Sequence, residues 1–219
     1  MNTNNLNYNL ILKQNLKELE KSNKIPTLLL HSCCAPCSSA VLFRLCKHFD
    51  ITIFYYNPNI TDEEEYIKRL NEQKKFIDLI NQGKVEEITP IKPIKLISCP
   101  FEKNEWEKEI WGLELEKEGG ARCYKCYNFR LTKTAEYAKD NNFDYFGTTL
   151  SVSPYKNSLW LNEIGKTLEE KFEIKYLYAD FKKENGYKLS IELSYKYGLY
   201  RQNYCGCIYS KKSIKEEQN

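Results

Sequence analysis

The sequence predicts an α/β fold in which a parallel sheet carries helices on both faces. Short apolar runs alternate with longer amphipathic segments along the 219 residues, and this alternation is typical of βαβ units. The leucines of TLLLHS, at 27–32, are consecutive rather than alternating, as expected for a strand buried on both faces. Binding sites in such sheets are built from loops at the carboxyl ends of the strands, so we expect the functional site at that edge.

Each expected element follows from a local pattern. After the first strand, Val41, Leu42, Leu45 and Phe49 recur at helical spacing and predict a helix that begins near Ser38. The expected elements are, in order, a helix within 6–22, a strand at 27–32, a helix from about 38, a strand at 51–59, a helix at 61–81, a strand within 84–98, a helix opening at the cysteines of 121–126, strands at 144–152 and 174–179 on either side of a helix at 157–172, and a helix at 186–198.

The helix at 61–81 has the clearest boundary signals. Thr61 and Glu64 form a capping-box pattern at its start, and Gly83 is the residue type that commonly ends a helix. Two prolines within 84–98 limit the length of the strand that follows.

The composition suits one well-packed domain. Hydrophobic residues make up 42% of the chain and charged residues 29%, which argues against disorder. The net charge of +3 excludes a histone-like polycation but allows a local face for nucleic acid.

We expect an N-terminal helical extension (1–24), a single α/β catalytic domain (25–210) and a polar C-terminal tail (211–219). With neither a signal-peptide pattern nor a run of about 18 apolar residues, the protein is expected to be cytoplasmic, with no membrane partner.

Seven of the nine cysteines fall into three tight clusters. Each cluster lies in a turn or at the start of a helix, where the helix N-terminus offsets the negative charge of thiolates. In a reducing cytosol, such spacing indicates metal binding or redox chemistry rather than disulfides. The clusters are Cys33, Cys34 and Cys37, then Cys123 and Cys126, then Cys205 and Cys207.

Three kinds of site are compatible with these clusters. Structural zinc takes four ligands, and a second zinc would need a histidine; His31 ends a buried strand, and His48 closes a helix and suits its C-terminal dipole. A dithiol redox site at Cys123 and Cys126 lacks the usual preceding strand. Four thiolates satisfy one 4Fe–4S cluster and leave three for a second metal. This arithmetic favours a two-part iron–sulfur centre.

Five motifs follow one another between about residues 27 and 210: LLLHSCCAPCS, FYYNPNI, RCYKCYNFRL, DYFGTTLSVSPYK and GLYRQNYCGCIYS. In this order they resemble the QueH-type epoxyqueuosine reductases, a match far more specific than any single C-x-x-C. The resemblance implies an oxidoreductase that reduces epoxyqueuosine to queuosine at the wobble position of tRNA. This is the last step of queuosine biosynthesis, and the family implies that it proceeds without cobalamin.

The resemblance also implies cofactors and partners. It implies a 4Fe–4S cluster, a nearby mononuclear metal expected to be iron, tRNA carrying epoxyqueuosine, and a low-potential electron donor that the sequence does not identify. Members of the family carry Cys or Asp at the position of Cys37. Because Asp suits a separate hard metal, we assign Cys37 to the mononuclear metal.

The two remaining cysteines are predicted not to bind metal. Cys46 lies on the apolar face of its helix, where a free cysteine behaves as a small hydrophobe. Cys99 precedes Pro100. The family resemblance leads us to expect a tyrosine or an acidic residue near this point of the loop, and this chain departs from that pattern. The other seven cysteines suffice for a cluster and one metal.

Candidate catalytic and substrate-binding residues lie in the motif loops. Tyr155 and Tyr209 are candidate proton donors, and Tyr127 is a candidate surface for a base, because bases in RNA loops are splayed out and stacked on aromatic planes. Three cations beside the motifs are expected to bind the substrate, through phosphate in particular. They are Arg130, Lys156 and Arg201.

The expected fold also resembles the Rossmann-like, nucleotide-hydrolase-like proteins that thiolate tRNA, which is an analogy of fold alone. Their glycine-rich phosphate loop is replaced here by residues 32–37, so we predict no use of ATP. Two other functions stay open: another iron–sulfur tRNA-modifying enzyme, which would need that loop, and a zinc-binding RNA-binding module, which metal analysis would separate.

Overall fold

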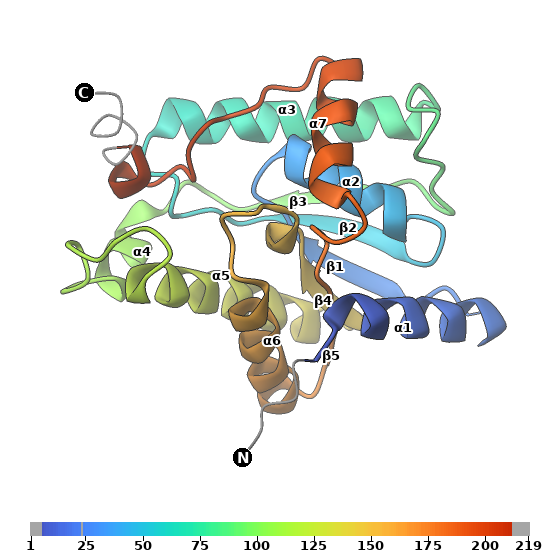
Figure 1. Cartoon of the computed structure of the whole chain (residues 1–219), viewed down its shortest axis with the longest axis horizontal. Helices are drawn as coiled ribbons and strands as arrows, with labels where there is room; N and C mark the ends of the chain where they lie inside the picture. The colour runs from blue at the N-terminus through green and yellow to red at the C-terminus, as the bar shows by residue number, and fades with distance from the viewer. Residues whose placement is uncertain (1–5, 23, 212–219) are drawn as a thin grey trace.

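The computed structural model describes residues 6–22 and 24–211. In this part of the chain, five parallel strands form one sheet in the order β3-β2-β1-β4-β5 (Figure 1). The strands are β1 (Thr27–His31), β2 (Asp50–Tyr55), β3 (Lys95–Ser98), β4 (Tyr145–Thr148) and β5 (Lys175–Tyr176). The helices are α1 (Tyr8–Ser22), α2 (Ala35–Leu45), α3 (Glu63–Asn81), α4 (Lys103–Glu109), α5 (Ala121–Asp140), α6 (Ser158–Phe172) and α7 (Gly186–Lys196), with a short 3₁₀ turn at Leu150–Val152. The predicted α/β fold is confirmed.

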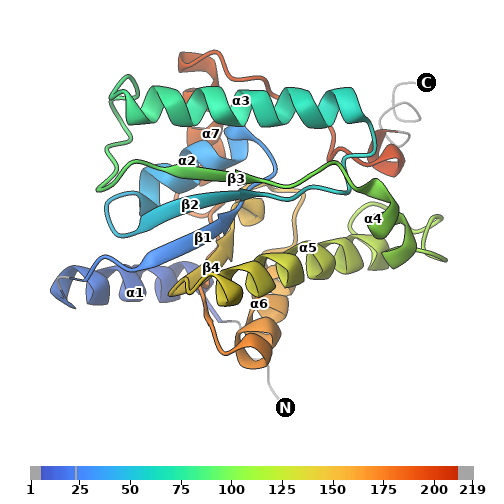
Figure 2. The ribbon, with the colours of Figure 1, turned by 180° about the vertical axis from the view of Figure 1, so that it is seen from behind.

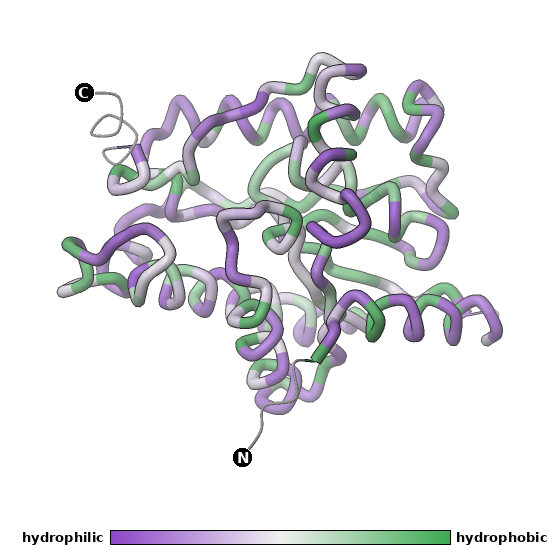
Figure 3. Tube along the Cα trace, viewed as in Figure 1, coloured by the Kyte–Doolittle hydropathy of each residue, from purple (hydrophilic) through white to green (hydrophobic). Residues whose placement is uncertain are grey.

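Helices cover both faces of the sheet. Helices α2, α3 and α7 lie on one face, and α5 and α6 lie on the other (Figure 2). Leu28 and Leu30 of β1 pack into the core of the first face, and Leu29 packs into the core of the second. Apolar stretches are concentrated in the central strands, whereas the outer helices alternate between polar and apolar residues (Figure 3). The consecutive leucines of β1 are therefore explained by burial on two sides.

The strand order places the turn after β1 at a switch point. From β1 the sheet extends through β2 and β3 in one direction and through β4 and β5 in the other. The last residue of β1, His31, pairs in register with Phe54 of β2 and Thr148 of β4. A crevice at the carboxyl ends of the strands is expected where the connections diverge in this way.

Several element boundaries differ from the prediction. Helix α2 begins at Ala35 rather than near Ser38, because Pro36 fits the first turn, where no backbone donor is required. The cap of α3 is Asp62, whose carboxylate accepts from Glu65 N at 3.3 Å, rather than Thr61. Strands β3 and β5 are shorter than expected, and the prolines before β3 explain its late start.

The structure describes most of the predicted N-terminal extension but little of the predicted C-terminal tail. Helix α1 lies within the predicted N-terminal extension, yet its Leu12 is fully buried in the core beside α2. Of the predicted C-terminal tail, only Lys211 lies among the described residues. No described helix has the length and apolar character needed to cross a membrane.

Candidate metal centre

The seven clustered cysteines gather at the carboxyl edge of the sheet. Three segments supply them: the turn from β1 into α2, the first turns of α5, and the loop that follows α7. The second and third segments line a common hollow, and the first and third line a common cavity. The sequence expectation that the site forms at this edge therefore agrees with the geometry.

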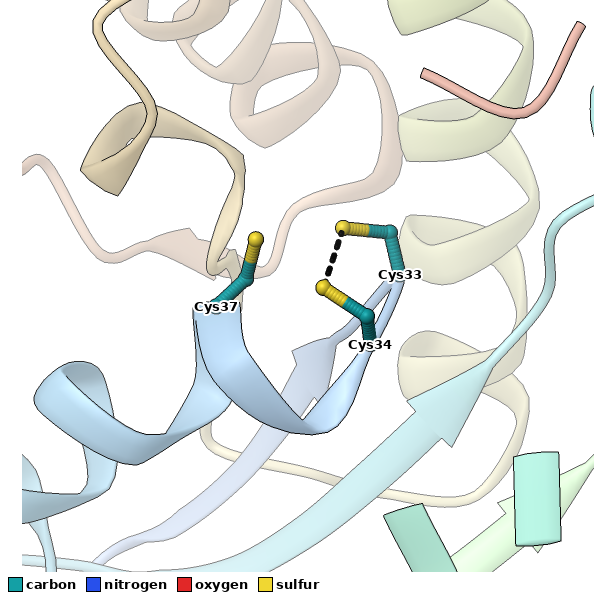
Figure 4. Close-up of side chains that lie close together, drawn as sticks. All are labelled: Cys33, Cys34 and Cys37. Carbon is teal, nitrogen blue, oxygen red and sulfur yellow. Dashed lines mark hydrogen bonds between the residues drawn. The ribbon is translucent and has the colours of Figure 1, made fainter. Parts of the chain in front are cut away.

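Cys33, Cys34 and Cys37, hereafter the cysteine trio, form a compact group. Their three Sγ atoms all lie within 4.8 Å of one another, and the side chains point toward one another (Figure 4). Cys33 Sγ and Cys34 Sγ are 3.6 Å apart, and Gln202 Nε2 donates to Cys34 Sγ at 3.0 Å. The trio has the donor atoms and the spacing to hold one metal ion while leaving a coordination position open.

The three thiols of the trio ionise differently. Burial raises the pKa of Cys34, but hydrogen bonds from Cys33 and Cys37 and the charge of Arg69 outweigh burial and hold this pKa well below its ordinary value. The hydrogen bonds that Cys33 and Cys37 donate raise the pKa of both thiols. Cys33 and Cys37 are thus protonated in the metal-free trio, and a metal ion bound to all three thiols must displace their protons.

The other four cysteines, hereafter the cysteine quartet, line one small hollow between α5 and the loop after α7. Lys156 Nζ lies 3.1 Å from Cys205 Sγ, and Gly119 N donates to Cys123 Sγ at 3.2 Å. Within the described residues, the trio alone brings three or more possible ligand atoms within 4.8 Å, so the quartet is the wider group. Its members are Cys123, Cys126, Cys205 and Cys207.

Burial favours the neutral thiol at three members of the quartet. Burial raises the pKa of Cys126 to about 11 and also raises the pKa of Cys123 and of Cys207. Lys156 is only 8% exposed. Burial acts to lower its pKa, but the charges of Cys205, Tyr127 and Glu118 and the hydrogen bond to Cys205 together outweigh burial and raise the pKa well above its ordinary value. A buried cation at this position offsets the negative charge that metal-bound thiolates would gather.

A cavity of about 610 Å³ opens beside the trio. Cys33 and Cys37 form part of its wall. Cys205, Lys156 and Glu118 line both this cavity and the hollow of the quartet, so the quartet reaches the cavity beside the trio through Cys205. The volume is in the range of small-molecule sites.

Most of the sequence-predicted substrate residues line the cavity. Tyr155, Lys156, Arg130 and Arg201 all contribute to its wall. Tyr155 is 75% exposed, so its ring is open to a ligand. Arg201 Nη1 donates to Ser190 O at 3.1 Å, which fixes the guanidinium at the wall.

Arg130 and Tyr127 are buried more deeply than their expected contacts with RNA suggest. Arg130 is fully buried, and its Nη2 donates to Asn57 Oδ1 at 2.6 Å. Tyr127 is 2% exposed and lines the hollow of the quartet, with Lys156 Nζ 5.8 Å from its ring centroid. Both residues therefore reach a ligand from the inner walls of the site and not from the protein surface.

Tyr209 and His31 lie apart from the cavity. Tyr209 packs against Trp106, with Arg122 over its ring at 4.3 Å, and it is not among the described residues that line the hollow or the cavity. His31 is fully buried, with its ring nitrogens 3.0 Å from Thr148 Oγ1 and 3.1 Å from Tyr56 O. Burial lowers the pKa of His31 to about 3. With both nitrogens engaged, His31 is a structural residue and not a zinc ligand.

Sequence reasoning missed the polar residues of α3 that contact the cysteine segments. Gln73 Oε1 accepts from Ser32 Oγ at 2.9 Å, and Arg69, only 1% exposed, donates to Cys205 O. A signal was present: Tyr66, Arg69 and Gln73 recur at helical spacing on the buried face of α3. Polar residues inside an apolar stripe indicate buried partners.

The two unclustered cysteines lie outside the trio and the quartet. Cys46 is 1% exposed and packs in the core beside α2, as its place on the apolar face predicted. Cys99 follows β3, where burial raises the pKa of its thiol to about 11. Neither is among the described residues that line the hollow or the cavity, and their exclusion from metal binding stays a prediction.

The fold and the site define a parallel α/β protein with a cysteine-rich centre at the carboxyl edge of its sheet. The model of the family described as epoxyqueuosine reductase QueH matches residues 28–213. A curated relative with this name from Streptococcus pyogenes is 39% identical over 207 residues, covering 94% of this chain and 79% of the relative.

Two further relatives carry the same name. The one from Staphylococcus aureus is 37% identical and covers 96% of this chain and 86% of its own length. The one from Thermotoga maritima is 35% identical and covers 84% of this chain and 90% of its own length. The chain therefore belongs to the epoxyqueuosine reductase QueH family, a family of oxidoreductases, and the resemblance inferred from the five motifs is confirmed.

Proposed function

We propose that this protein reduces epoxyqueuosine to queuosine in tRNA, in the cytoplasm and without cobalamin. In this reaction both C–O bonds of the epoxide break, a C=C bond forms, and the oxygen leaves as water after taking up two electrons and two protons. Family membership supports the substrate. The observation that carries the proposal for the site is that members of both cysteine groups, Cys33 and Cys37 of the trio and Cys205 of the quartet, line one cavity of about 610 Å³.

The donor set fits an iron–sulfur centre in two parts. Four thiols in the wider quartet suit a 4Fe–4S cluster, and the compact trio, with Cys37 in it, suits a mononuclear metal that we propose to be iron. When bound, the two centres supply the electrons and a Lewis acid beside the epoxide. Lys156 and Gly119 N, which contact the thiols of the quartet, would stabilise the bound thiolates.

The protein groups around the cavity orient the substrate and exclude water. Tyr155 offers an open ring on which the wobble base can stack, and its hydroxyl is our candidate proton donor. Arg201, fixed by Ser190, and Lys156 supply positive charge at the wall. Because Tyr209 does not line the cavity, we do not assign it a step.

Nucleoside mass spectrometry of tRNA tests the reaction. A deletion strain with no second reductase should accumulate epoxyqueuosine, and the wild-type gene should restore queuosine. The Cys46→Ala gene should restore it equally, whereas Cys34→Ala should not. Unchanged queuosine in the deletion strain would refute the proposed function.

Metal analysis tests the cofactors separately. Protein reconstituted anaerobically with iron and sulfide should hold about five iron ions per chain and show broad visible absorption that dithionite bleaches. Dithionite also serves as a surrogate for the unidentified electron donor. A colourless protein that retains zinc alone would favour the zinc-binding RNA-binding module instead.

A further inference from the structure

The loop that carries Cys205, hereafter the cysteine loop (residues 199–207), is fastened to α3 as well as to α7, the helix before it in the chain, to which Arg201 bonds. At one end of the loop, Tyr200 N donates to Glu72 Oε1 of α3 at 3.1 Å. At the other end, Thr61 N, just before α3, donates to Gly206 O at 3.2 Å. Contacts to α3 and to the residue before its cap therefore hold both ends of the cysteine loop, including the end that carries Cys205.

Arg69 of α3 makes the central contacts with the cysteine loop. Its Nη1 donates to Cys205 O at 3.0 Å, and its Nη2 donates to Tyr204 O at 3.4 Å. Its Nε donates to Glu65 Oε1 at 2.6 Å, which supplies the countercharge. The side chain is 1% exposed, and a buried guanidinium requires such partners for its donors. The planar fork of Arg69 thus holds two successive carbonyls of the loop.

Gly206 shows how closely the loop approaches this guanidinium. Its φ is +118°, in the region that favours glycine, and a Cβ built on it would lie 2.8 Å from Ile60 Cγ1 and 3.3 Å from Arg69 Nη1. Any side chain at this position would push the loop away from α3. Glycine between Cys205 and Cys207 therefore lets the loop approach closely enough for the guanidinium of Arg69 to bind the two carbonyls. This pair of hydrogen bonds is hereafter called the Arg69 clamp.

We propose that Arg69 is a positioning residue that fixes the thiol of Cys205, the member of the quartet that also lines the cavity beside the trio. Cys205 lines both the hollow and the cavity, and Lys156 Nζ contacts its Sγ from the other side. Arg69 holds the backbone of Cys205 and of the residue before it. Arg69 is not among the described residues that line either space, so its effect on Cys205 passes through the backbone of the loop.

Thiol alkylation in the full-length protein, stripped of metal by a chelator, tests this position. Peptide mass spectrometry after timed exposure to iodoacetamide gives a rate for each cysteine. In Arg69→Lys, which keeps the charge but loses the fork, Cys205 should react about tenfold faster because the local structure opens more often. Cys46 in the core and Cys123 in the same hollow should keep their wild-type rates. Gly206→Ala disturbs the Arg69 clamp from the side of the loop and should give the same pattern.

Arg44→Lys is the matched control. Arg44 is a partly buried arginine of α2 that pairs with Asn9 and Glu184, away from the cysteine loop, so this variant should leave the Cys205 rate unchanged. After reconstitution, Arg69→Lys should also bind less iron per chain than Arg44→Lys.

Two results would overturn the inference. One is a Cys205 rate within twofold of wild type in folded Arg69→Lys and Gly206→Ala proteins. The other is an equal rise at Cys46, Cys123 and Cys205, which would show a general loss of stability. If Arg69→Lys does not fold, Gly206→Ala decides. Any role of Arg69 in catalysis rests on the proposed function. The alkylation rates do not, because no metal or substrate is present when they are measured.

Discussion

The cysteine trio and the cysteine quartet are built in opposite ways. The trio comes from one stretch of five residues at the start of α2, and its thiols hydrogen bond to one another. The quartet joins α5 to a loop far along the chain, and that loop is held in place by a third element, α3. Local geometry sets the first group, whereas tertiary packing sets the second. The quartet should therefore respond to changes at distant residues that leave the trio intact.

The largest effect is expected from removing one member of each group. Cys126→Ala should abolish the visible chromophore and the bound sulfide together with activity, because a 4Fe–4S cluster needs its fourth thiolate. Cys37→Ala should lose activity and about one iron ion per chain but keep the chromophore. Iron and sulfide assays on anaerobically reconstituted protein measure the loss of iron and of sulfide in each variant. If Cys37→Ala loses sulfide as fully as Cys126→Ala does, the assignment of the two groups to separate centres is wrong.

A second, smaller effect is expected at Lys156, which faces both groups. Lys156→Met should lower kcat by about 10- to 100-fold, as loss of a residue that supports metal ligands commonly does. The variant should also make the reduction potential of the proposed cluster in the quartet more negative. A nearby cation stabilises the reduced state, which carries more negative charge, and this variant lacks that cation. Spectroelectrochemical titration measures the potential. Lys196→Met, which removes a surface lysine paired with Glu87, is the control, and equal potentials in the two variants would contradict the prediction.

Metal uptake by the trio and by the quartet should depend on pH. The pKa is raised for Cys33 and Cys37 in the trio and for Cys123, Cys126 and Cys207 in the quartet. Thiols with raised pKa are protonated at neutral pH and must lose protons to bind metal, so affinity should rise as pH rises.

The number of protons released sharpens this prediction. A variant with alanine at both Cys123 and Cys126 leaves the trio, in which the pKa values of Cys33 and Cys37 are raised, and should release at least two protons per bound ion. Titration with Co²⁺ in weakly buffered solution measures the release. An affinity that does not change between pH 6 and pH 8 would show that the thiols are ionised before metal binds; this window lies roughly where an unperturbed thiol is mostly protonated.

The smallest effects are expected at the two cysteines outside both groups. Cys46→Ala should lower the free energy of unfolding by about 1 kcal/mol, because it removes a buried sulfur from the core. Cys99→Ala should leave the iron content unchanged. Denaturant unfolding and iron assays check the two outcomes, with Cys123→Ala as the positive control for metal loss. Equal iron loss in Cys99→Ala and Cys123→Ala would require Cys99 to be added to the ligands.

The fold was predictable because its signals are local. Consecutive leucines in β1 and helical spacing in α2 follow from burial within a few residues of chain. The start of α2 was missed because its N-cap, Cys34, forms no side-chain cap hydrogen bond and so carries no capping signal. Pro36 marked the true start, but its place in the first turn is recognisable only once the helix is known.

The sequence was enough to predict which cysteines form the site, but not how they divide into the trio and the quartet. Spacing identifies the seven cysteines, yet it cannot show that three of them meet within 4.8 Å while the other four share a hollow. That division depends on how α5 and the cysteine loop pack. The same limit explains Tyr209, which belongs to a motif but packs against Trp106, and Arg69, which belongs to no motif but contacts Cys205.

The position of the cysteine loop after all five strands also bears on how the protein is made. Domains begin to fold as the chain leaves the ribosome, N-terminal parts first. The trio lies directly after β1 and is synthesised early, whereas Cys205 and Cys207 emerge only after β5 and α7. During translation, Cys123 and Cys126 are therefore available before their partners exist. Insertion of the proposed cluster into the quartet would therefore have to wait until Cys205 and Cys207 have emerged, and a nascent chain that stalls before Cys205 can offer metal only the trio and half of the second site.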